Sequence, residues 1–190
     1  MKRSVILVGV GGQGAILTAK VLVNGLIEKG YDVKMSEVHG MSQRGGSVST
    51  QVIFGDKVYS PLLGRGEADI MVAFEKMEAV RYAPYLRPDG IAVINDYEQA
   101  SSSIAAGLAE YPAGCLEAMQ AHFRCITLRA AELAAALGNP KCMNLVLFGA
   151  MSKLPELDGI DWEDVIRRTV PPKFVELNLA AYRAGRDAVE

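Results

Sequence analysis

The feature that most constrains the fold is a short apolar run that leads directly into a cluster of glycines. Residues 5–8 read Val-Ile-Leu-Val, and Gly9, Gly11 and Gly14 follow before a stretch with helical character. Apolar runs rich in β-branched residues favour buried strands, and closely spaced glycines permit a tight turn between a strand and a helix. The sequence therefore predicts a strand, a turn and a helix at its start.

The glycine turn, Gly9-Val10-Gly11-Gly12-Gln13-Gly14, contains residues with separate predicted roles. Gly9 is expected to permit the sharp bend, Gly11 the close approach of a ligand or another backbone, and Gly14 the packing of the helix on the strand. The free amides of the first helical turn can then bind an anion. This pattern is Rossmann-like, and the candidate cofactor contacts are Gly9, Gly11, Gly12, Gln13 and Gly14.

Two interpretations of this turn are open. A dinucleotide-binding protein carries an acid at the end of its second strand, and Glu37, at the end of a strand predicted over residues 32–38, is suitably placed. The alternative is that the turn only closes a corner between strand and helix or contacts a partner subunit, because one fold serves many functions.

A second glycine-rich segment covers residues 37–47 and reads Glu-Val-His-Gly-Met-Ser-Gln-Arg-Gly-Gly-Ser. In an open α/β sheet it leaves the carboxyl end of a strand beside the first turn, where ligands bind, so both glycine segments should face one crevice. Arg44, next to Gly45 and Gly46, is suited to bidentate binding of a phosphate or carboxylate. Arg44 pairing with Glu37 or with an acid of another chain is the alternative.

The candidate contacts of the second segment are Glu37, His39, Gly40, Gln43, Arg44, Gly45, Gly46 and Ser47. A hydrogen-bonding role is predicted for His39 because the only other histidine, His122, and the nearby acids and cysteines do not have metal-ligand spacing. No nucleophile, histidine and acid triad is indicated, so no residue is assigned a catalytic role.

The rest of the chain alternates predicted strands and helices. Strands are expected at residues 48–54, 68–74, 91–94 and 125–128, with a hairpin or ribbon at a sheet edge formed by residues 57–59. Helices are expected at residues 13–29, 116–123, 131–137, 142–154 and 174–189, with another opened by Glu75 and Glu78 and one capped by Asp161. The sequence predicts an α/β, Rossmann-like, mostly parallel sheet flanked by helices, with a helical C-terminal portion, in a single domain over residues 1–190.

Composition excludes several kinds of partner. The 20 basic and 22 acidic residues nearly balance, so neither nucleic acid nor an anionic membrane is an expected partner. The apolar runs are far shorter than the roughly 20 residues that cross a bilayer, and no signal peptide is indicated, so a cytoplasmic location is expected. Cys115, Cys125 and Cys142 contain no Cys-x-x-Cys pair and are expected to be buried thiols rather than disulfide, zinc or iron–sulfur ligands.

The two glycine segments together resemble one known family. The combination of Gly9–Gly14 with residues 36–47 is similar to the gamma-type domain of 2-oxoacid:ferredoxin oxidoreductases. Among these proteins, the sequence of residues 37–47 most resembles the beta subunit of indolepyruvate ferredoxin oxidoreductase. Further short segments that are similar to this family occur along nearly the whole chain, among them residues 58–61, 111–112, 137–139 and 144–150.

The resemblance implies a heteromeric complex that oxidatively decarboxylates a 2-oxoacid, transfers the acyl group to coenzyme A and passes electrons to ferredoxin. It implies that thiamine diphosphate and the 4Fe-4S clusters lie in a larger catalytic partner subunit, so that no cofactor is bound tightly by this chain, which is inactive alone. The glycine segments are then expected to contact that partner and coenzyme A, with Arg44 and the turn amides as phosphate contacts. A stand-alone NAD-binding protein and a purely structural assembly module are the alternatives.

Overall fold

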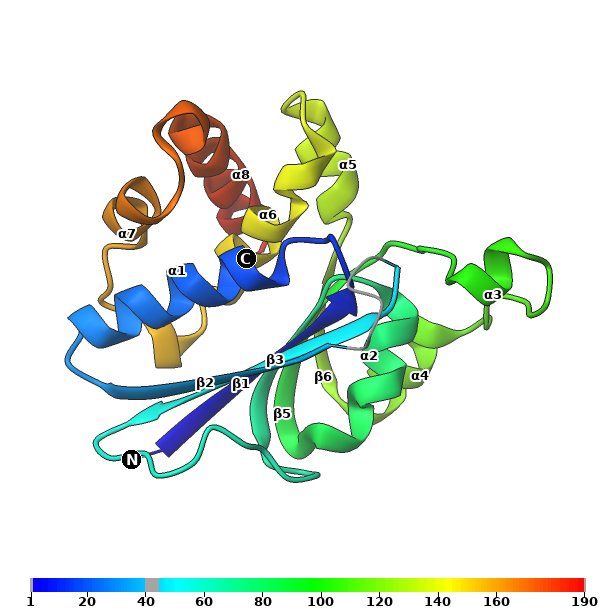
Figure 1. Ribbon diagram of the computed structural model, residues 1–190, viewed down its shortest axis with the longest axis horizontal. Coiled ribbons are helices and arrows are strands. Elements are labelled where there is room, and N and C mark those ends of the chain that lie inside the picture. Colours follow the sequence, from blue (N-terminus) through cyan, green and yellow to red (C-terminus); the bar gives the residue numbers. More distant parts are fainter. Residues whose placement is uncertain (1, 40–44, 190) are drawn as a thin grey trace.

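The computed structural model describes residues 2–39 and 45–189, which form one six-stranded mixed sheet with helices on both faces (Figure 1). The strand order is β2-β3-β1-β4-β5-β6. The strands are β1 (Lys2–Val10), β2 (Asp32–His39), β3 (Ser47–Gly55), β4 (Ala68–Ala73), β5 (Leu86–Asn95) and β6 (Arg124–Leu128). The predicted α/β fold with flanking helices is confirmed.

Strand β3 lies inside the sheet and runs antiparallel to both of its neighbours. Gly55 is paired with Lys2 of β1 on one side and with Asp32 of β2 on the other, whereas β1, β4, β5 and β6 pair in parallel. The predicted edge ribbon is therefore wrong, because residues 57–59 form no strand. The run Val52-Ile53-Phe54, apolar on both faces, is typical of an interior strand.

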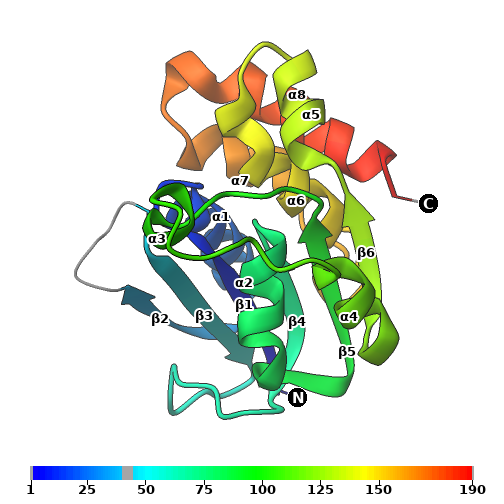
Figure 2. The ribbon, with the colours of Figure 1, turned by 90° about the vertical axis from the view of Figure 1, so that its right-hand side faces the viewer.

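Helices cover the two faces of the sheet as separate layers (Figures 1 and 2). One layer contains α1 (Ala15–Glu28), α5 (Ala130–Ala136), α6 (Met143–Met151), α7 (Trp162–Thr169) and α8 (Val175–Asp187); the other contains α2 (Lys76–Tyr82) and α4 (Cys115–His122). Short helical turns connect them: η1 (Ala83–Tyr85), α3 (Ser102–Ala105), η2 (Pro140–Cys142), η3 (Pro155–Leu157) and η4 (Pro172–Phe174). The predicted helical C-terminal portion is thus confirmed.

Each face of the sheet has its own hydrophobic core. Val5 and Leu7 of β1 point into the core beneath α1 and α6, whereas Ile6 and Val8 point into the core beneath α2. This alternation follows from the two-residue period of a strand, and each such fully buried side chain contributes about 1.5–3 kcal/mol. The strand that leads to the glycine turn is therefore held firmly from both sides.

The burial of apolar side chains differs between the first and last helices. Leu179 and Tyr182 of α8 are 0% and 3% exposed because α8 packs closely on α6. In α1, Leu22 is part of the core, whereas Ile16 and Ile27 are exposed. Asp161 caps α7 as predicted, accepting a hydrogen bond from the Asp164 amide over 3.1 Å.

None of the described helices has the length and apolar character needed to cross a membrane.

Candidate functional site

The glycine turn after β1 bends at Gly12 and Gly14, not at Gly9. Gly12 has a φ of 103° and Gly14 a φ of 88°, in the left-handed region that favours glycine. Gly9 is still part of β1, and a Cβ atom there would lie 2.6 Å from the Gln13 Oε1 atom and 2.9 Å from the Phe74 Cβ atom. The role of Gly9 is therefore to leave room for the side chain of Gln13, which corrects its predicted role in the bend.

Gln13 folds back beneath the turn and holds it together. Its Oε1 atom accepts a hydrogen bond from the Val10 amide over 2.7 Å, and its Nε2 atom donates to the Gln99 Oε1 atom over 3.0 Å. The side chain is buried, and both of its polar ends are bonded within the chain. Gln13 thus stabilises the shape of the turn, a role that the spacing of the glycines did not indicate.

Gly14 allows a close contact with α6 rather than with the strand. A Cβ atom on Gly14 would lie 2.6 Å from the Asn144 Nδ2 atom, and this buried amide donates to the Gly14 carbonyl oxygen over 3.3 Å. Gly14 is also the N-cap of α1, with no side-chain cap and no acid in the first turn. The amides that begin α1 are therefore not covered by an acidic side chain of that turn.

The two glycine segments are bonded to each other through their backbones. The Gly11 amide donates to the Gly46 carbonyl oxygen over 2.8 Å, and the Gly45 amide donates to the Gly11 carbonyl oxygen over 3.4 Å. These bonds continue the pairing of β1 with β3, in which Val10 is opposite Ser47. The predicted proximity of the two segments is confirmed.

A pocket of about 340 Å³ lies between the glycine turn, the start of α1 and the ends of β2 and β3. Ile16 and Val38 line it and are 50% and 52% exposed, so much of its wall is apolar. Glu37, an exposed residue of β2 paired with Thr50, supplies a carboxylate. The residues that line the pocket are Val10, Gly11, Gly12, Gln13, Gly14, Ala15, Ile16, Glu37, Val38, Val48, Ser49 and Thr50.

This pocket gathers many of the residues predicted as ligand contacts. Gly11, Gly12, Gln13, Gly14 and Glu37 line it directly. Gly45 and Gly46 adjoin it through their bonds to Gly11. Gly40, Gln43 and Arg44 lie outside the described residues, as does the side chain of His39, whose backbone pairs with Val48.

The side chain of Ser47 is hydrogen-bonded to a buried acid, Glu78. Its hydroxyl donates to the Glu78 Oε2 atom, and the Glu78 Oε1 atom accepts from the Arg81 Nε atom over 3.0 Å. Glu78 is 2% exposed. The sequence marked Glu78 only as part of a helix start, because nothing in the local pattern shows that its carboxylate is buried against a residue 31 positions away.

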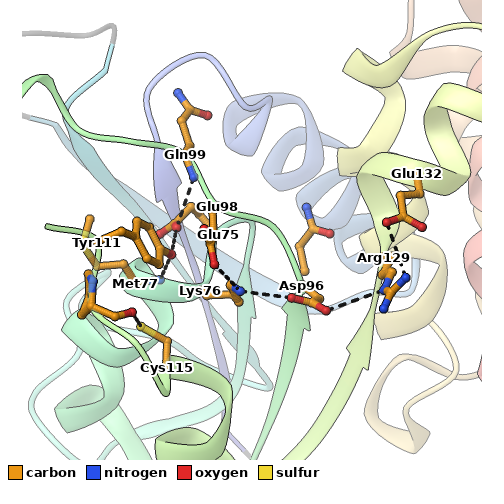
Figure 3. Close-up of polar contacts among 12 residues, drawn as sticks. Glu75, Lys76, Met77, Asp96, Glu98, Gln99, Tyr111, Cys115, Arg129 and Glu132 are labelled. Atoms are coloured by element: carbon orange, nitrogen blue, oxygen red, sulfur yellow. Dashed lines mark hydrogen bonds and ion pairs between the residues drawn. The ribbon is translucent and has the colours of Figure 1, made fainter. Parts of the chain in front are cut away.

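A second buried acid, Glu75, lies two residues beyond the carboxyl end of β4 (Figure 3). The Glu75 side chain is 0% exposed and accepts hydrogen bonds from the Tyr111 hydroxyl and, over 2.9 Å, from the Glu78 amide. Burial, and then the bond to Glu75, raise the pKa of Tyr111 well above its usual value. The sequence did not identify this cluster as a unit.

An ion-pair network borders the same region. The Lys76 Nζ atom lies 2.8 Å from the Glu98 Oε1 atom and 3.3 Å from the Asp96 Oδ1 atom, and Arg129 lies on the far side of Asp96 (Figure 3). The hydrogen bond to Glu98 is the main reason why the pKa of Lys76 is raised. Lys76 is therefore held in its charged form and tied to the segment after β5.

The cysteines do not form a cluster in the described structure. Cys115 and Cys142 are buried, Cys125 is partly buried, and all three are free thiols whose pKa is raised by burial. Within residues 2–39 and 45–189, no group of three His, Cys, Asp or Glu side chains is placed to hold a metal ion.

The fold and the paired glycine segments define a Rossmann-like α/β protein with a crevice at one end of its sheet. Residues 4–188 match the family model described as pyruvate ferredoxin/flavodoxin oxidoreductase, and the chain belongs to this family. It is 37% identical over 195 residues to indolepyruvate oxidoreductase subunit IorB of Pyrococcus horikoshii, covering 98% of this chain and 96% of that protein. IorB of Archaeoglobus fulgidus is also 37% identical, over 192 residues that cover 97% of this chain and 94% of that protein.

Solved structures share the fold at lower identity. The gamma subunit of a keto/oxoacid ferredoxin oxidoreductase from Geobacter sulfurreducens aligns with a TM-score of 0.72 and 22% identity, covering 98% of this chain and 97% of that chain. The 2-oxoglutarate:ferredoxin oxidoreductase from Magnetococcus marinus, solved with 2-oxoglutarate, coenzyme A and succinyl-CoA bound, aligns with a TM-score of 0.74 and 18% identity. That match covers 98% of this chain but only 31% of the longer one, so the same fold occurs there as part of a larger chain.

Proposed function

We propose that the chain is the small, cluster-free subunit of a 2-oxoacid:ferredoxin oxidoreductase that acts on indolepyruvate or a related 2-oxoacid. The observation that carries this proposal is the near full-length similarity to IorB, at 37% identity, combined with the two glycine segments joined at Gly11 and Gly46. The whole complex would decarboxylate the oxoacid, transfer the acyl group to coenzyme A and pass the electrons to ferredoxin. Residues 1–190 would form one domain of this assembly.

The pocket beside the glycine turn is proposed to hold part of coenzyme A. Its volume, about 340 Å³, lies at the lower end of the range for small-molecule sites, so it suits one portion of so large a molecule. Amides at the start of α1 suit a phosphate, and the apolar wall formed with Ile16 and Val38 suits an adenine ring or a pantetheine arm. Arg44 is proposed as a second phosphate contact. The remainder of coenzyme A would extend to the partner subunit.

A stand-alone NAD-binding function is not favoured by the sheet order. In a dinucleotide-binding fold the second strand is adjacent to the first, so its terminal acid reaches the ribose. Here β3 separates β1 from β2, and Glu37 is therefore roughly 10 Å, instead of roughly 5 Å, across the sheet from the turn. The two IorB relatives described above are also named as subunits, not as independent dehydrogenases.

The chain is proposed to need a larger partner for activity. Thiamine diphosphate and 4Fe-4S clusters would supply carbanion stabilisation and electron transfer from that partner, to which ferredoxin binds in turn. The three free thiols of this chain are separated and buried, which does not fit cluster binding. Free thiols fit a reducing compartment, and a cytoplasmic location is kept as part of the proposal.

The proposal is tested by an indolepyruvate- and coenzyme A-dependent dye-reduction assay of the chain alone and with its co-purifying partner. Activity should require the large partner. Arg44→Ala should raise the KM for coenzyme A roughly tenfold, since it removes a charged contact with phosphate. Arg65→Ala, at an exposed arginine outside the pocket, is the matched control and should leave the KM unchanged.

Three results would reject parts of this proposal. Tight binding of NAD by the purified chain, without a partner, would favour the independent dehydrogenase. An unchanged KM for coenzyme A together with unchanged assembly in Arg44→Ala would remove the coenzyme A role of this segment. Weakened assembly with normal kinetics in the remaining complex would favour a purely structural module.

A further inference from the structure

The carboxyl ends of β1 and β4 are the place where the sheet changes the face on which its helices pack. α1, which follows β1, lies on one face, and α2, which follows β4, lies on the other (Figures 1 and 2). Open α/β sheets commonly bind ligands in the crevice at such a point. In this protein, polar side chains of the chain itself meet at this point, with Glu75 at their centre (Figure 3).

Glu75 accepts hydrogen bonds from three different parts of the chain. Its Oε2 atom accepts from the Glu78 amide over 2.9 Å, which caps α2. Its Oε1 atom accepts from the Tyr111 hydroxyl and, over 3.4 Å, from the Gln99 amide. All three partners donate hydrogen bonds. A carboxylate has only acceptor atoms, so it can accept all three bonds and brings no donor that would compete with them.

Gln99 and Tyr111 are the two ends of a projecting loop. Residues 99–111 include α3 and extend away from the body of the molecule in Figure 1. Both ends are bonded to Glu75, and the Tyr111 hydroxyl also accepts from the Met77 amide over 3.1 Å. Such a loop with adjacent ends is an Ω-loop, and Glu75 fastens it to the sheet at its base.

The same loop base is connected to the glycine turn. The Gln99 Oε1 atom accepts from Gln13, whose own Oε1 atom accepts from the Val10 amide inside the turn. A second hollow of about 260 Å³, between the turn and the segment of α5 and η2, is lined by both Gln13 and Gln99. A displacement of Gln99 therefore acts on the turn through one side chain that is almost fully buried.

We propose that Glu75 is a positioning residue: by fastening Gln99 and Tyr111 it fixes Gln13, and thereby sets the geometry of the glycine turn for coenzyme A. This inference rests on the proposed function for its ligand, but the effect on the turn itself does not depend on that ligand. Glu75 touches no ligand in this scheme. Loosening the base of the loop should weaken coenzyme A binding without slowing the turnover of the saturated complex.

The test compares Tyr111→Phe with Tyr59→Phe in the assembled complex. Tyr111→Phe removes only the hydroxyl that joins Glu75 and Met77, whereas Tyr59 is 88% exposed and serves as the matched control. Tyr111→Phe should raise the KM for coenzyme A roughly threefold to tenfold while kcat stays within about twofold, as expected for the loss of one buried hydrogen bond. Tyr59→Phe should change neither constant.

Glu75→Gln is the second variant, because an amide places a donor among the donors that surround Glu75. Its effect on the KM should not add to that of Tyr111→Phe, since both act on one contact. Glu98→Gln, at an exposed acid next to Gln99, is its control and should leave the KM unchanged. Equal effects of Glu75→Gln and Glu98→Gln would overturn the inference.

Hydrogen exchange of the purified chain separates this inference from the proposed function. Tyr111→Phe should speed exchange of the Val10 amide, which is bonded to Gln13, and Tyr59→Phe should not. If Arg44→Ala raises the KM for coenzyme A but Tyr111→Phe changes neither the KM nor the exchange of Val10, the positioning role is wrong. If Tyr111→Phe speeds exchange of Val10 but neither variant changes the KM, the turn is positioned by Glu75 and the coenzyme A function fails instead.

Discussion

The amide of Gly11 donates to the carbonyl oxygen of Gly46 over 2.8 Å, and this bond joins two segments separated by 35 positions into one wall of a crevice. It continues the antiparallel pairing of β1 with β3 beyond Val10, the last residue of β1, and Ser47, the first residue of β3. The geometry of the crevice therefore depends on the pairing of β1 with β3 in the sheet.

Gly14→Ala should destabilise the chain more than a glycine replacement in open space. An added Cβ would lie 2.6 Å from the Asn144 Nδ2 atom, and the φ of 88° is unfavourable for alanine, so a loss of about 2–4 kcal/mol is expected. Gly114→Ala is the control: it has a φ of 73° and no atom within 4 Å of the added Cβ, and should cost about 1 kcal/mol. Urea unfolding of both variants measures the difference, and equal losses would show that contact with Asn144 is unimportant.

Gly185→Ala should destabilise the chain despite the higher helix propensity of alanine. Propensity favours alanine by about 1 kcal/mol in a helix interior. The added Cβ, however, would lie 1.8 Å from the Val146 carbonyl oxygen, so α8 has to move away from α6 at a cost of about 3 kcal/mol or more. The thermal midpoint of the variant tests this balance, and an increased midpoint would show that the two helices separate at little cost.

Asp69 should make stability depend on pH below neutrality. Burial alone would raise the pKa of its carboxyl group, but hydrogen bonds from Arg87, Ser4 and Arg3 outweigh burial and lower that pKa. The unfolded state therefore binds the proton more readily, so the stabilisation is complete above the unfolded pKa of about 3.9 and is lost as the pH falls through the lower folded value.

Asp69→Asn should accordingly lower the unfolding free energy at pH 7 by about 2 kcal/mol and weaken its decline in acid. Asp89→Asn is the control, because Asp89 also pairs with Arg87 but its side chain is 73% exposed. Urea unfolding between pH 7 and pH 2 measures both variants, because the decline is expected below the unfolded pKa of about 3.9. A decline with pH that is as steep in Asp69→Asn as in the unaltered chain would contradict the prediction.

Val38→Asp should impair coenzyme A binding with little effect on the fold. Val38 is 52% exposed and lines the crevice, so an added carboxylate would repel phosphate groups and raise the KM for coenzyme A roughly tenfold. Met35→Asp, on the same strand but outside the pocket lining, should leave the KM unchanged. The assay is steady-state kinetics of the assembled complex, and equal effects of the two variants would argue against coenzyme A in this pocket.

Much of the fold follows from local patterns in the sequence. The run of Val-Ile-Leu-Val before the glycines specifies β1, and Asp161 followed by acids specifies the start of α7. Both signals are local: one depends on alternating burial along a strand and the other on the free amides of a helix start. The two glycine segments were recognised in the same way, from residue types at short spacing.

The position of β3 between β1 and β2 in the sheet could not be predicted from the sequence, because strand order depends on pairing between distant segments. The roles of Gly9 and Gln13 were missed for a related reason: the space that Gln13 occupies is defined jointly by β1 and Phe74. The burial of Leu179 and Tyr182 could not be predicted, because a helix with apolar residues does not reveal which neighbour covers them.

The sequence by itself determined the strand, turn and helix units and the residue types of the crevice, since these depend on backbone preferences and short-range periodicity. Only the tertiary structure decided that the Gly11 amide bonds to the Gly46 carbonyl oxygen and that Glu75 and Glu78, at the start of α2, are buried. A carboxylate is stabilised in the interior only when donors from several segments converge on it. For Glu75 those donors come from Gln99, Tyr111 and Glu78, and only the folded chain brings them together.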